Sequence, residues 1–419
     1  MISCIEALGY RSLRDVQQTL QAFQVLVGPN ASGKSTFLDV SLFIGDLLRL
    51  GVVEAVRSRS PNPRNLVWME AADRFELAIE LRIPEERRAR LRNGHEEARY
   101  EVAIGQDAAG ELVIFGETLW LKPGAQAQSN TRRQRSLFPE QRDIRPVLVS
   151  PEGQRAPAGW KRVVTKRSES GNDYFFSETS GWNNPFRLGP RKTSLANLPE
   201  DEERFPVATW VRRTLMEGLQ RLALHSEAMR RPSPPGSPAG FAADGSNLPW
   251  AVERLRLKDG GRFDQWIAHV RTALPDVRAI TTVERPEDKH RYLQIEFGTG
   301  LKTPSWTVSD GTLRLLALTL VAYLDEPGSI YVIEEPENGI HPQAVECVFQ
   351  ALSSTYDSQV LCASHSPVVL SLAEPGQLLC FARTPGGATD VVRGTEHPRL
   401  AEWQRQIDLG TLFAAGVLG

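Results

Sequence analysis

A short segment near the amino terminus has the composition of a loop that binds phosphate. Residues 28–35 match the pattern Gly-x-x-x-x-Gly-Lys-Ser/Thr. Glycines let the backbone curl so that successive N–H groups point at phosphate oxygens. Lys34 offers a positive charge to the β- and γ-phosphates of a nucleotide, and Ser35 offers a hydroxyl ligand to Mg²⁺. The expected nucleotide-binding residues are Gly28, Pro29, Asn30, Ala31, Ser32, Gly33, Lys34, Ser35 and Thr36.

The elements around this segment are those that a phosphate loop needs. Residues 21–27 form an apolar run that predicts a strand ending at Gly28. Residues 36–50 carry apolar side chains at helical spacing, which predicts a helix directly after the loop. The amino terminus of that helix adds the positive end of its dipole to the site. A glycine-rich turn that contains Lys-Ser by chance is the alternative reading.

A pair of carboxylates follows a second apolar run. Residues 329–333 predict a buried strand, and Glu334 and Glu335 stand at its end. One acid in such a place can help to hold Mg²⁺, and the other can polarise an attacking water. We assign Glu334 to the metal and Glu335 to the general base. Without the phosphate loop, two acids on a solvated strand end would be the better interpretation.

Two further places in the second half of the chain could contact phosphate. Ser309 and Gly311 precede a helix predicted to run to about Leu324, and the amino terminus of a helix is suited to anions. A Ser-Asp-Gly sequence is also a common helix cap. His365 follows a predicted strand at residues 359–363, where it could sense the γ-phosphate. A lone histidine is otherwise more often structural.

Taken in chain order, these segments resemble the Walker A, signature, Walker B and H-loop motifs of an ABC-type ATPase, with residues 338–342 as the D-loop. Residues 5–13, 28–35 and 334–342 resemble the RecF/SMC/OLD branch, and most closely the stand-alone bacterial AAA family ATPases of phage-defence type. Residues 244–249 also resemble a segment of that branch. Two positions depart from the usual pattern: Ala31 replaces a glycine, and Glu334 replaces an aspartate. No glutamine after the first helix matches the Q-loop.

The resemblance implies an α/β P-loop NTPase fold, that of an ABC ATPase head, with an antiparallel β subdomain and a partly helical central insertion. It implies ATP and Mg²⁺ as cofactors, hydrolysis of ATP, and a homodimer or higher oligomer that forms through ATP. It also implies that Arg11 contacts the nucleotide, although a surface arginine is nearly as good an interpretation. A separate effector protein is the expected partner, as in phage-defence pairs, because the sequence shows neither a Toprim acid cluster nor a long coiled coil.

The rest of the chain divides into three predicted parts. Residues 1–122 form an amino-terminal ATPase lobe, in which runs at 75–81, 100–104 and 112–115 predict an antiparallel meander. Residues 123–300 form a central basic and helical insertion, irregular over 121–200 and mainly helical over 205–274. Residues 301–419 form the carboxyl-terminal ATPase lobe, and from Arg278 onward the pattern favours alternating strands and helices with a parallel sheet.

The central part supports an alternative function, that of a DNA-binding, RecF-like ATPase in repair. Residues 121–200 contain 14 lysines and arginines against seven acidic residues, a net charge of +7. Such a patch with interleaved aromatic rings can follow phosphates and stack on bases. A solvated arginine-rich insertion, or an interface for an acidic partner, explains the same composition. The residues concerned are Arg132, Arg133, Arg135, Lys161, Arg162, Lys166, Arg167, Arg191 and Lys192, with Trp160, Tyr174, Phe175, Phe176 and Trp182.

Composition is typical of a globular protein, with 41% apolar and 24% charged residues and a net charge of −2. Cys4, Cys347, Cys362 and Cys380 lack the spacing of a metal site, so we expect buried free thiols and a cytoplasmic location. The apolar stretch at 313–324 is too short to span a bilayer, which gives no support to a membrane role.

Overall fold

The computed structural model describes residues 1–91, 94–124, 135, 137–140, 143–151, 155–167, 173–237, 240–355, 357–398 and 400 of the chain. Its strands are β1 (Ile2–Tyr10), β2 (Leu13–Thr19), β3 (Phe23–Val27), β4 (Arg74–Arg82), β5 (His95–Gln106), β6 (Leu112–Pro123), β7 (Lys161–Arg167), β8 (Asp173–Phe176), β9 (Asn183–Phe186), β10 (Leu219–Leu222), β11 (Val277–Glu284), β12 (Arg291–Phe297), β13 (Lys302–Pro304), β14 (Ile330–Glu334), β15 (Gln359–Ala363), β16 (Leu378–Arg383) and β17 (Thr389–Arg393). Its α-helices are α1 (Lys34–Leu50), α2 (Val52–Arg57), α3 (Glu85–Arg88), α4 (Pro206–Arg213), α5 (Ser226–Arg230), α6 (Leu248–Lys258), α7 (Gly260–Ala273), α8 (Asp310–Val321), α9 (Pro342–Ser353) and α10 (Pro367–Leu372).

One large sheet is antiparallel and has the order β2-β1-β4-β5-β6-β7-β8-β9. The predicted meander is confirmed, since β4, β5 and β6 pair in sequence. The prediction of irregular structure over residues 121–200 is wrong for β7, β8 and β9, which extend this sheet. In β7 only Val163 and Val164 are apolar, so the alternation that identifies a strand is weak there. The division of the chain at residues 122 and 300 stays a prediction, although strands on both sides of residue 122 share this sheet.

The second large sheet holds the predicted site. Its order is β10-β14-β15-β3-β16-β17, and all neighbours are parallel except β16 and β17. The strand before the phosphate loop, β3, therefore lies between β15 and β16, and the carboxylate strand β14 lies on the other side of β15. The carboxyl ends of parallel strands meet at one edge, which brings residues 28, 334 and 364 together although they are far apart in the chain.

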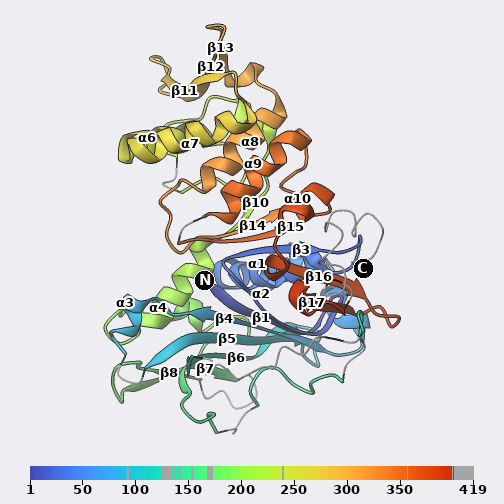
Figure 1. Cartoon of the computed structure of the whole chain (residues 1–419). Helices are drawn as coiled ribbons and strands as arrows, with labels where there is room; N and C mark the ends of the chain where they lie inside the picture. The colour runs from blue at the N-terminus through green and yellow to red at the C-terminus, as the bar shows by residue number, and fades with distance from the viewer. Residues whose placement is uncertain are drawn as a thin grey trace.

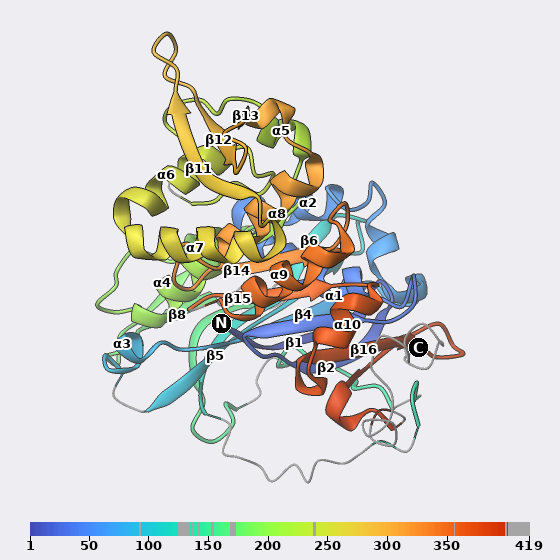
Figure 2. The same cartoon turned by 45° about the horizontal axis from the view of Figure 1, so that its top comes forward.

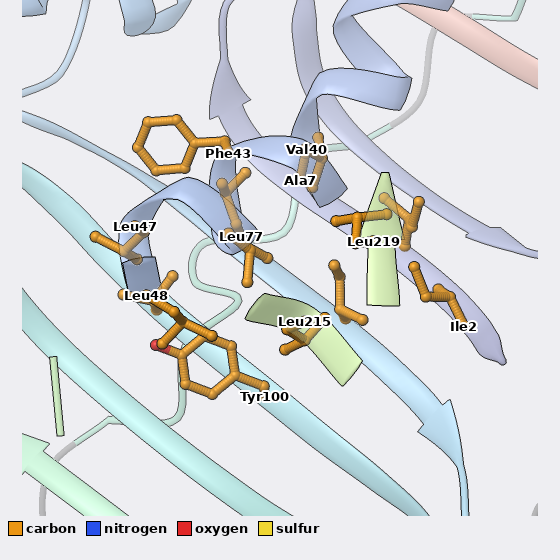
Figure 3. Close-up of a cluster of buried hydrophobic side chains, with 14 of the residues drawn as sticks. Ile2, Ala7, Val40, Phe43, Leu47, Leu48, Leu77, Tyr100, Leu215 and Leu219 are labelled. Atoms are coloured by element: carbon orange, nitrogen blue, oxygen red, sulfur yellow. The ribbon is translucent and has the colours of Figure 1, made fainter. Parts of the chain in front are cut away.

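Helix α1 lies between the two large sheets (Figure 1). The predicted apolar spacing is confirmed, because Phe37, Val40, Phe43, Ile44 and Leu47 are all fully buried. Figure 3 shows Val40, Phe43, Leu47 and Leu48 of this helix beside Ala7 and Leu77 of the antiparallel sheet and Leu215 and Leu219 before and in β10. Packing on two sides fixes α1, and with it the phosphate loop at its amino terminus.

On the opposite face of the parallel sheet, α8 and α9 lie between the sheet and helices α6 and α7 (Figure 1), and all four helices share a second hydrophobic core. The prediction of helices over 205–274 is confirmed for α4, α6 and α7, whereas β10 is a strand. Residues 277–304 depart from the expected parallel pattern, because β11, β12 and β13 pair locally as a small antiparallel sheet beyond these helices (Figure 2). The four cysteines are buried free thiols, as expected.

Candidate nucleotide-binding site

The phosphate loop has a backbone that only glycine can adopt at two positions. Gly28 has φ 147° and Gly33 has φ 104°. A Cβ atom on Gly28 would lie 2.2 Å from the carbonyl oxygen of Phe381, and one on Gly33 would lie 2.2 Å from Oγ1 of Thr389. Both obstacles belong to the β16–β17 hairpin. The glycines are therefore required both by backbone conformation and by the close approach of this hairpin.

Ala31 also lies in the left-handed region, with φ 61°. This is the position at which the sequence departs from the usual glycine. This conformation costs an alanine about 1–2 kcal/mol, because its Cβ atom lies too close to the following carbonyl oxygen. Ala31 is exposed.

The amine of Lys34 lies inside the loop. It donates hydrogen bonds to the carbonyl oxygens of Gly28, at 2.8 Å, and Pro29, at 2.9 Å. Burial lowers the pKa of Lys34 to about 8, against the opposing effect of the Glu335 and Glu334 charges. The phosphate loop thus holds the amine of Lys34 in place through two backbone carbonyl groups. With its lowered pKa, Lys34 loses its proton more readily than a surface lysine.

Ser35 and Glu334 meet at the point where the metal is predicted. The hydroxyl of Ser35 donates a hydrogen bond to Oε2 of Glu334 at 2.5 Å. The other carboxylate oxygen, Oε1, accepts a hydrogen bond from Nη2 of Arg221 at 2.7 Å. A hydroxyl and a carboxylate are oxygen ligands that suit Mg²⁺, so the predicted metal residues fit that ion. The structure brings these two residues together from α1 and β14.

Glu335 and His365 stand at the ends of neighbouring strands. Glu335 is exposed, has φ 49°, and donates its backbone N–H to the carbonyl oxygen of Ala363 at 2.7 Å. Burial lowers the pKa of His365, and the charge of Lys34 lowers it further. The lowered pKa favours the neutral form of the imidazole. Glu337 accepts hydrogen bonds from the Ser364 hydroxyl at 2.7 Å and from the backbone N–H of His365 at 3.3 Å, which fixes the segment that carries the histidine.

The predicted cap at Ser309 and Gly311 is a helix amino terminus in the structure. Ser309 caps α8, since its hydroxyl accepts a hydrogen bond from the backbone N–H of Thr312 at 3.2 Å. A Cβ atom on Gly311 would lie 2.7 Å from the carbonyl oxygen of Gly339, so the cap packs closely on the predicted D-loop. Helix α8 belongs to the core on the face of the parallel sheet opposite to α1. The cap and the phosphate loop of one chain therefore belong to different layers.

Arg11 lies in the turn between β1 and β2, and its backbone is left-handed, with φ 50°. Its guanidinium pairs with Asp39 of α1 at 3.3 Å, and the Tyr10 hydroxyl donates a hydrogen bond to the same carboxylate at 2.6 Å. The side chain of Arg11 is 31% exposed. Arg11 is thus anchored to the helix that follows the phosphate loop, and part of it stays accessible.

Three residues of this region were assigned no role from the sequence. Thr389 donates a hydrogen bond to the carbonyl oxygen of Ser32 at 3.0 Å, Arg221 contacts Glu334, and Glu337 holds residues 364 and 365. Glu337 lies two residues after the predicted base, so the carboxylate-rich sequence there could have indicated it. Arg221 and Thr389 come from strands whose place beside the site follows only from the sheet order.

Most described side chains of the predicted basic patch contact the protein itself. Lys166 is 2% exposed and donates a hydrogen bond to the carbonyl oxygen of Gly189 at 2.8 Å. Arg135 pairs with Asp390 at 2.8 Å, and Arg162 stacks over Trp120 with its guanidinium carbon 4.7 Å from the ring centroid.

Other members of the patch behave in the same way. Lys161 donates a hydrogen bond to the carbonyl oxygen of Glu178 at 2.7 Å, and Phe175 stacks on Phe186. Arg132 and Arg133 lie outside the described residues. The described residues therefore lend less support to a DNA-binding surface than the composition suggested.

Comparison with known proteins agrees with this fold. The family model described as "AAA domain, putative AbiEii toxin, Type IV TA system" matches residues 23–371. An SMC head bound to the C-winged helix domain of ScpA is similar with a TM-score of 0.51 and 15% identity, covering 93% of this chain and 96% of that chain. The SMC head of Pyrococcus furiosus with an extended coiled coil, bound to the C-terminal domain of ScpA, gives 0.50 and 13%, covering 97% and 99%. No curated protein matches.

Fold and site together define an α/β P-loop NTPase with the architecture of an ABC-type ATPase head, as the sequence predicted. The chain belongs to the family of AAA domains described as putative AbiEii toxins of type IV toxin–antitoxin systems. Its fold is similar to that of the two SMC heads. Within the part of the chain that the structure describes, no helix has the length and apolar character needed to cross a membrane.

Proposed function

We propose that the chain binds ATP with Mg²⁺ and hydrolyses the bond between the β- and γ-phosphates. The contact between Ser35 and Glu334 carries this proposal. This hydrogen bond of 2.5 Å joins the hydroxyl of Ser35, at the end of the phosphate loop, to the carboxylate of Glu334 in β14. Strand β14 lies two places from β3, the strand that precedes the loop. When bound there, Mg²⁺ neutralises negative charge that develops on the phosphate oxygens.

The surrounding residues support distinct roles. The backbone N–H groups of residues 28–36 and the amine of Lys34 bind the phosphates. Glu335 accepts a proton from the water that attacks the γ-phosphorus, while the bond to the bridging oxygen breaks and ADP leaves. The neutral ring of His365 can donate a hydrogen bond to the γ-phosphate, and Arg11 contacts the nucleotide beside α1.

The second part of the proposal is a shared site. The Ser309–Gly311 cap and the phosphate loop lie in different layers of one chain. A second chain, turned by a two-fold axis, can present its cap to the γ-phosphate, and two ATP molecules then lie between two chains. ADP lacks the γ-phosphate, so hydrolysis would loosen the pair.

Hydrolysis is tested by phosphate release from the variant Glu335→Gln with ATP and Mg²⁺. The amide keeps the shape of the side chain but cannot accept a proton, so we expect ATP binding with loss of at least about 10²-fold in turnover. The matched variant Glu334→Gln should instead raise the Mg²⁺ concentration that turnover requires. Unchanged turnover in Glu335→Gln would show that another group is the base.

We further propose that this ATPase regulates a separate effector in a bacterial phage-defence system. The family description, which names a toxin–antitoxin system, supports this role. Expression of the protein with the product of its neighbouring gene should protect cells from phage, and Lys34→Ala should remove protection. The alternative, a RecF-like DNA-binding ATPase in repair, predicts instead that duplex or single-stranded DNA binds in a salt-dependent manner and stimulates turnover.

A further inference from the structure

Arg221 occupies a position beside the predicted metal ligand that no motif assigns. Strand β10 lies at the edge of the parallel sheet and pairs with β14, so that Arg221 lies opposite Val332. From there its guanidinium contacts Oε1 of Glu334 at 2.7 Å, while the Ser35 hydroxyl contacts Oε2 at 2.5 Å. One oxygen of the Glu334 carboxylate thus contacts the guanidinium of Arg221, and the other contacts the Ser35 hydroxyl, which is predicted to bind Mg²⁺.

Stabilisation of the fold is a weak reason for this ion pair. The side chain of Arg221 is 57% exposed and that of Glu334 is 28% exposed. Exposed ion pairs contribute little to stability, because water and salt screen them. Among the described residues, Arg221 forms a salt bridge with Glu334 and with no second carboxylate. Its charge therefore acts chiefly at the carboxylate that Mg²⁺ would use.

We propose that Arg221 competes with Mg²⁺ for Glu334. This inference rests on the proposed function. A guanidinium keeps its charge at every pH that a protein tolerates, so it opposes a second cation at the same carboxylate. The phosphates of ATP offset that repulsion, because they bring negative charge to the site together with the ion. Arg221 thus makes retention of the metal depend on the nucleotide.

A second role for the same contact makes the opposite prediction. If Arg221 only orients Glu334 toward Ser35, its loss would weaken Mg²⁺ binding. The variant Arg221→Gln separates the two roles, since an amide can still donate a hydrogen bond to Glu334 but carries no charge. Arg221→Lys is the matched control, because it keeps the charge and changes the shape of the donor.

The test measures the affinity for ATP in excess EDTA and in excess Mg²⁺, in the Glu335→Gln background, which suppresses turnover. The readout is the factor by which Mg²⁺ increases ATP affinity. We expect this factor to rise about three- to tenfold in Arg221→Gln, as removal of one screened positive charge near a divalent ion implies. Arg221→Lys should resemble the parent protein. An unchanged or smaller factor in Arg221→Gln would overturn the proposal.

A double substitution confirms where the charge acts. In a Glu334→Gln background, Arg221→Gln should change the Mg²⁺ factor by much less, because the shared carboxylate is gone. An undiminished effect there would place the action of Arg221 elsewhere and overturn the proposal. If the parent protein binds no ATP in Mg²⁺, the proposed nucleotide site itself fails. If the parent binds ATP and Arg221→Gln leaves the factor unchanged, only the role of Arg221 fails.

Discussion

The hydroxyl of Thr389 donates a hydrogen bond to the carbonyl oxygen of Ser32 at 3.0 Å, which ties the β16–β17 hairpin to the phosphate loop. The Ser12 hydroxyl lies 3.0 Å from the same Thr389 oxygen. Ser32 is buried, so its carbonyl group depends on a partner within the protein. Thr389 also fills the space beside Gly33. The β16–β17 hairpin therefore helps to hold the conformation of the phosphate loop, although the two segments lie far apart in the sequence.

Thr389→Val should weaken ATP binding and lower the free energy of unfolding. Valine has nearly the same shape but leaves the Ser32 carbonyl without its donor, at a cost of about 1–3 kcal/mol. Thr389→Ser keeps the hydroxyl and should bind ATP with nearly normal affinity. Calorimetric titration with ATP and urea unfolding measure both effects. Equal affinity in Thr389→Val and the parent protein would show that this hydrogen bond does not hold the loop.

Ala31→Gly should stabilise the protein. Glycine removes the cost of a Cβ atom at φ 61°, and its greater freedom in the unfolded chain offsets part of the gain. We expect a net increase of about 0.5–1 kcal/mol in the free energy of unfolding. Ala31→Val should be destabilising, because a β-branched residue tolerates this conformation least. Urea unfolding of the three proteins provides the comparison, and a less stable Ala31→Gly would contradict the strain assigned to Ala31.

The pKa of Lys34 predicts how ATP binding depends on pH. Burial lowers this pKa to about 8, so the fraction of charged amine falls as the pH rises through 8. Because phosphate binds the charged form, ATP affinity should fall above pH 8, by at most about tenfold per pH unit. At pH 8.5, binding should also take up protons, which titration in buffers of different ionisation enthalpy detects.

Lys34→Arg is the control for that dependence, since its side chain stays charged. This variant should lose the proton uptake even if its affinity is lower. Lys34→Ala should lose ATP binding altogether. A pH dependence that is the same in Lys34→Arg and the parent protein would assign the titration to another group.

The sequence predicted those parts of the site that lie within one short window. The phosphate loop, the strand before it and α1 could be predicted because glycine positions and helical spacing are local signals. Glu334 and Glu335 could be placed because they end an apolar strand. The meeting of Glu334 with Ser35 required only the rule that parallel strands end at one edge.

Residues that reach the site through the sheet order could not be predicted in the same way. Arg221 follows from the place of β10 beside β14, and Thr389 follows from the return of the β16–β17 hairpin to β3. Strand β7 was missed for a different reason, because only two of its residues are apolar. Its cations, which suggested a solvated patch, bind backbone carbonyls and rings. Composition shows how many charges a segment carries but not what those charges contact.

The central claim, a site completed by two chains, is tested most directly by mixing two inactive variants. Lys34→Ala should be unable to bind ATP, and Ser309→Arg should bind ATP but block the cap that faces the partner. A mixed dimer then has one intact site, made of the phosphate loop of the Ser309→Arg chain and the cap of the Lys34→Ala chain. The account predicts ATPase activity that peaks in an equal mixture, at up to about a quarter of the parent rate if the sites act independently. Activity no higher than the sum of the two separate variants, with mixed dimers shown to form, would contradict it.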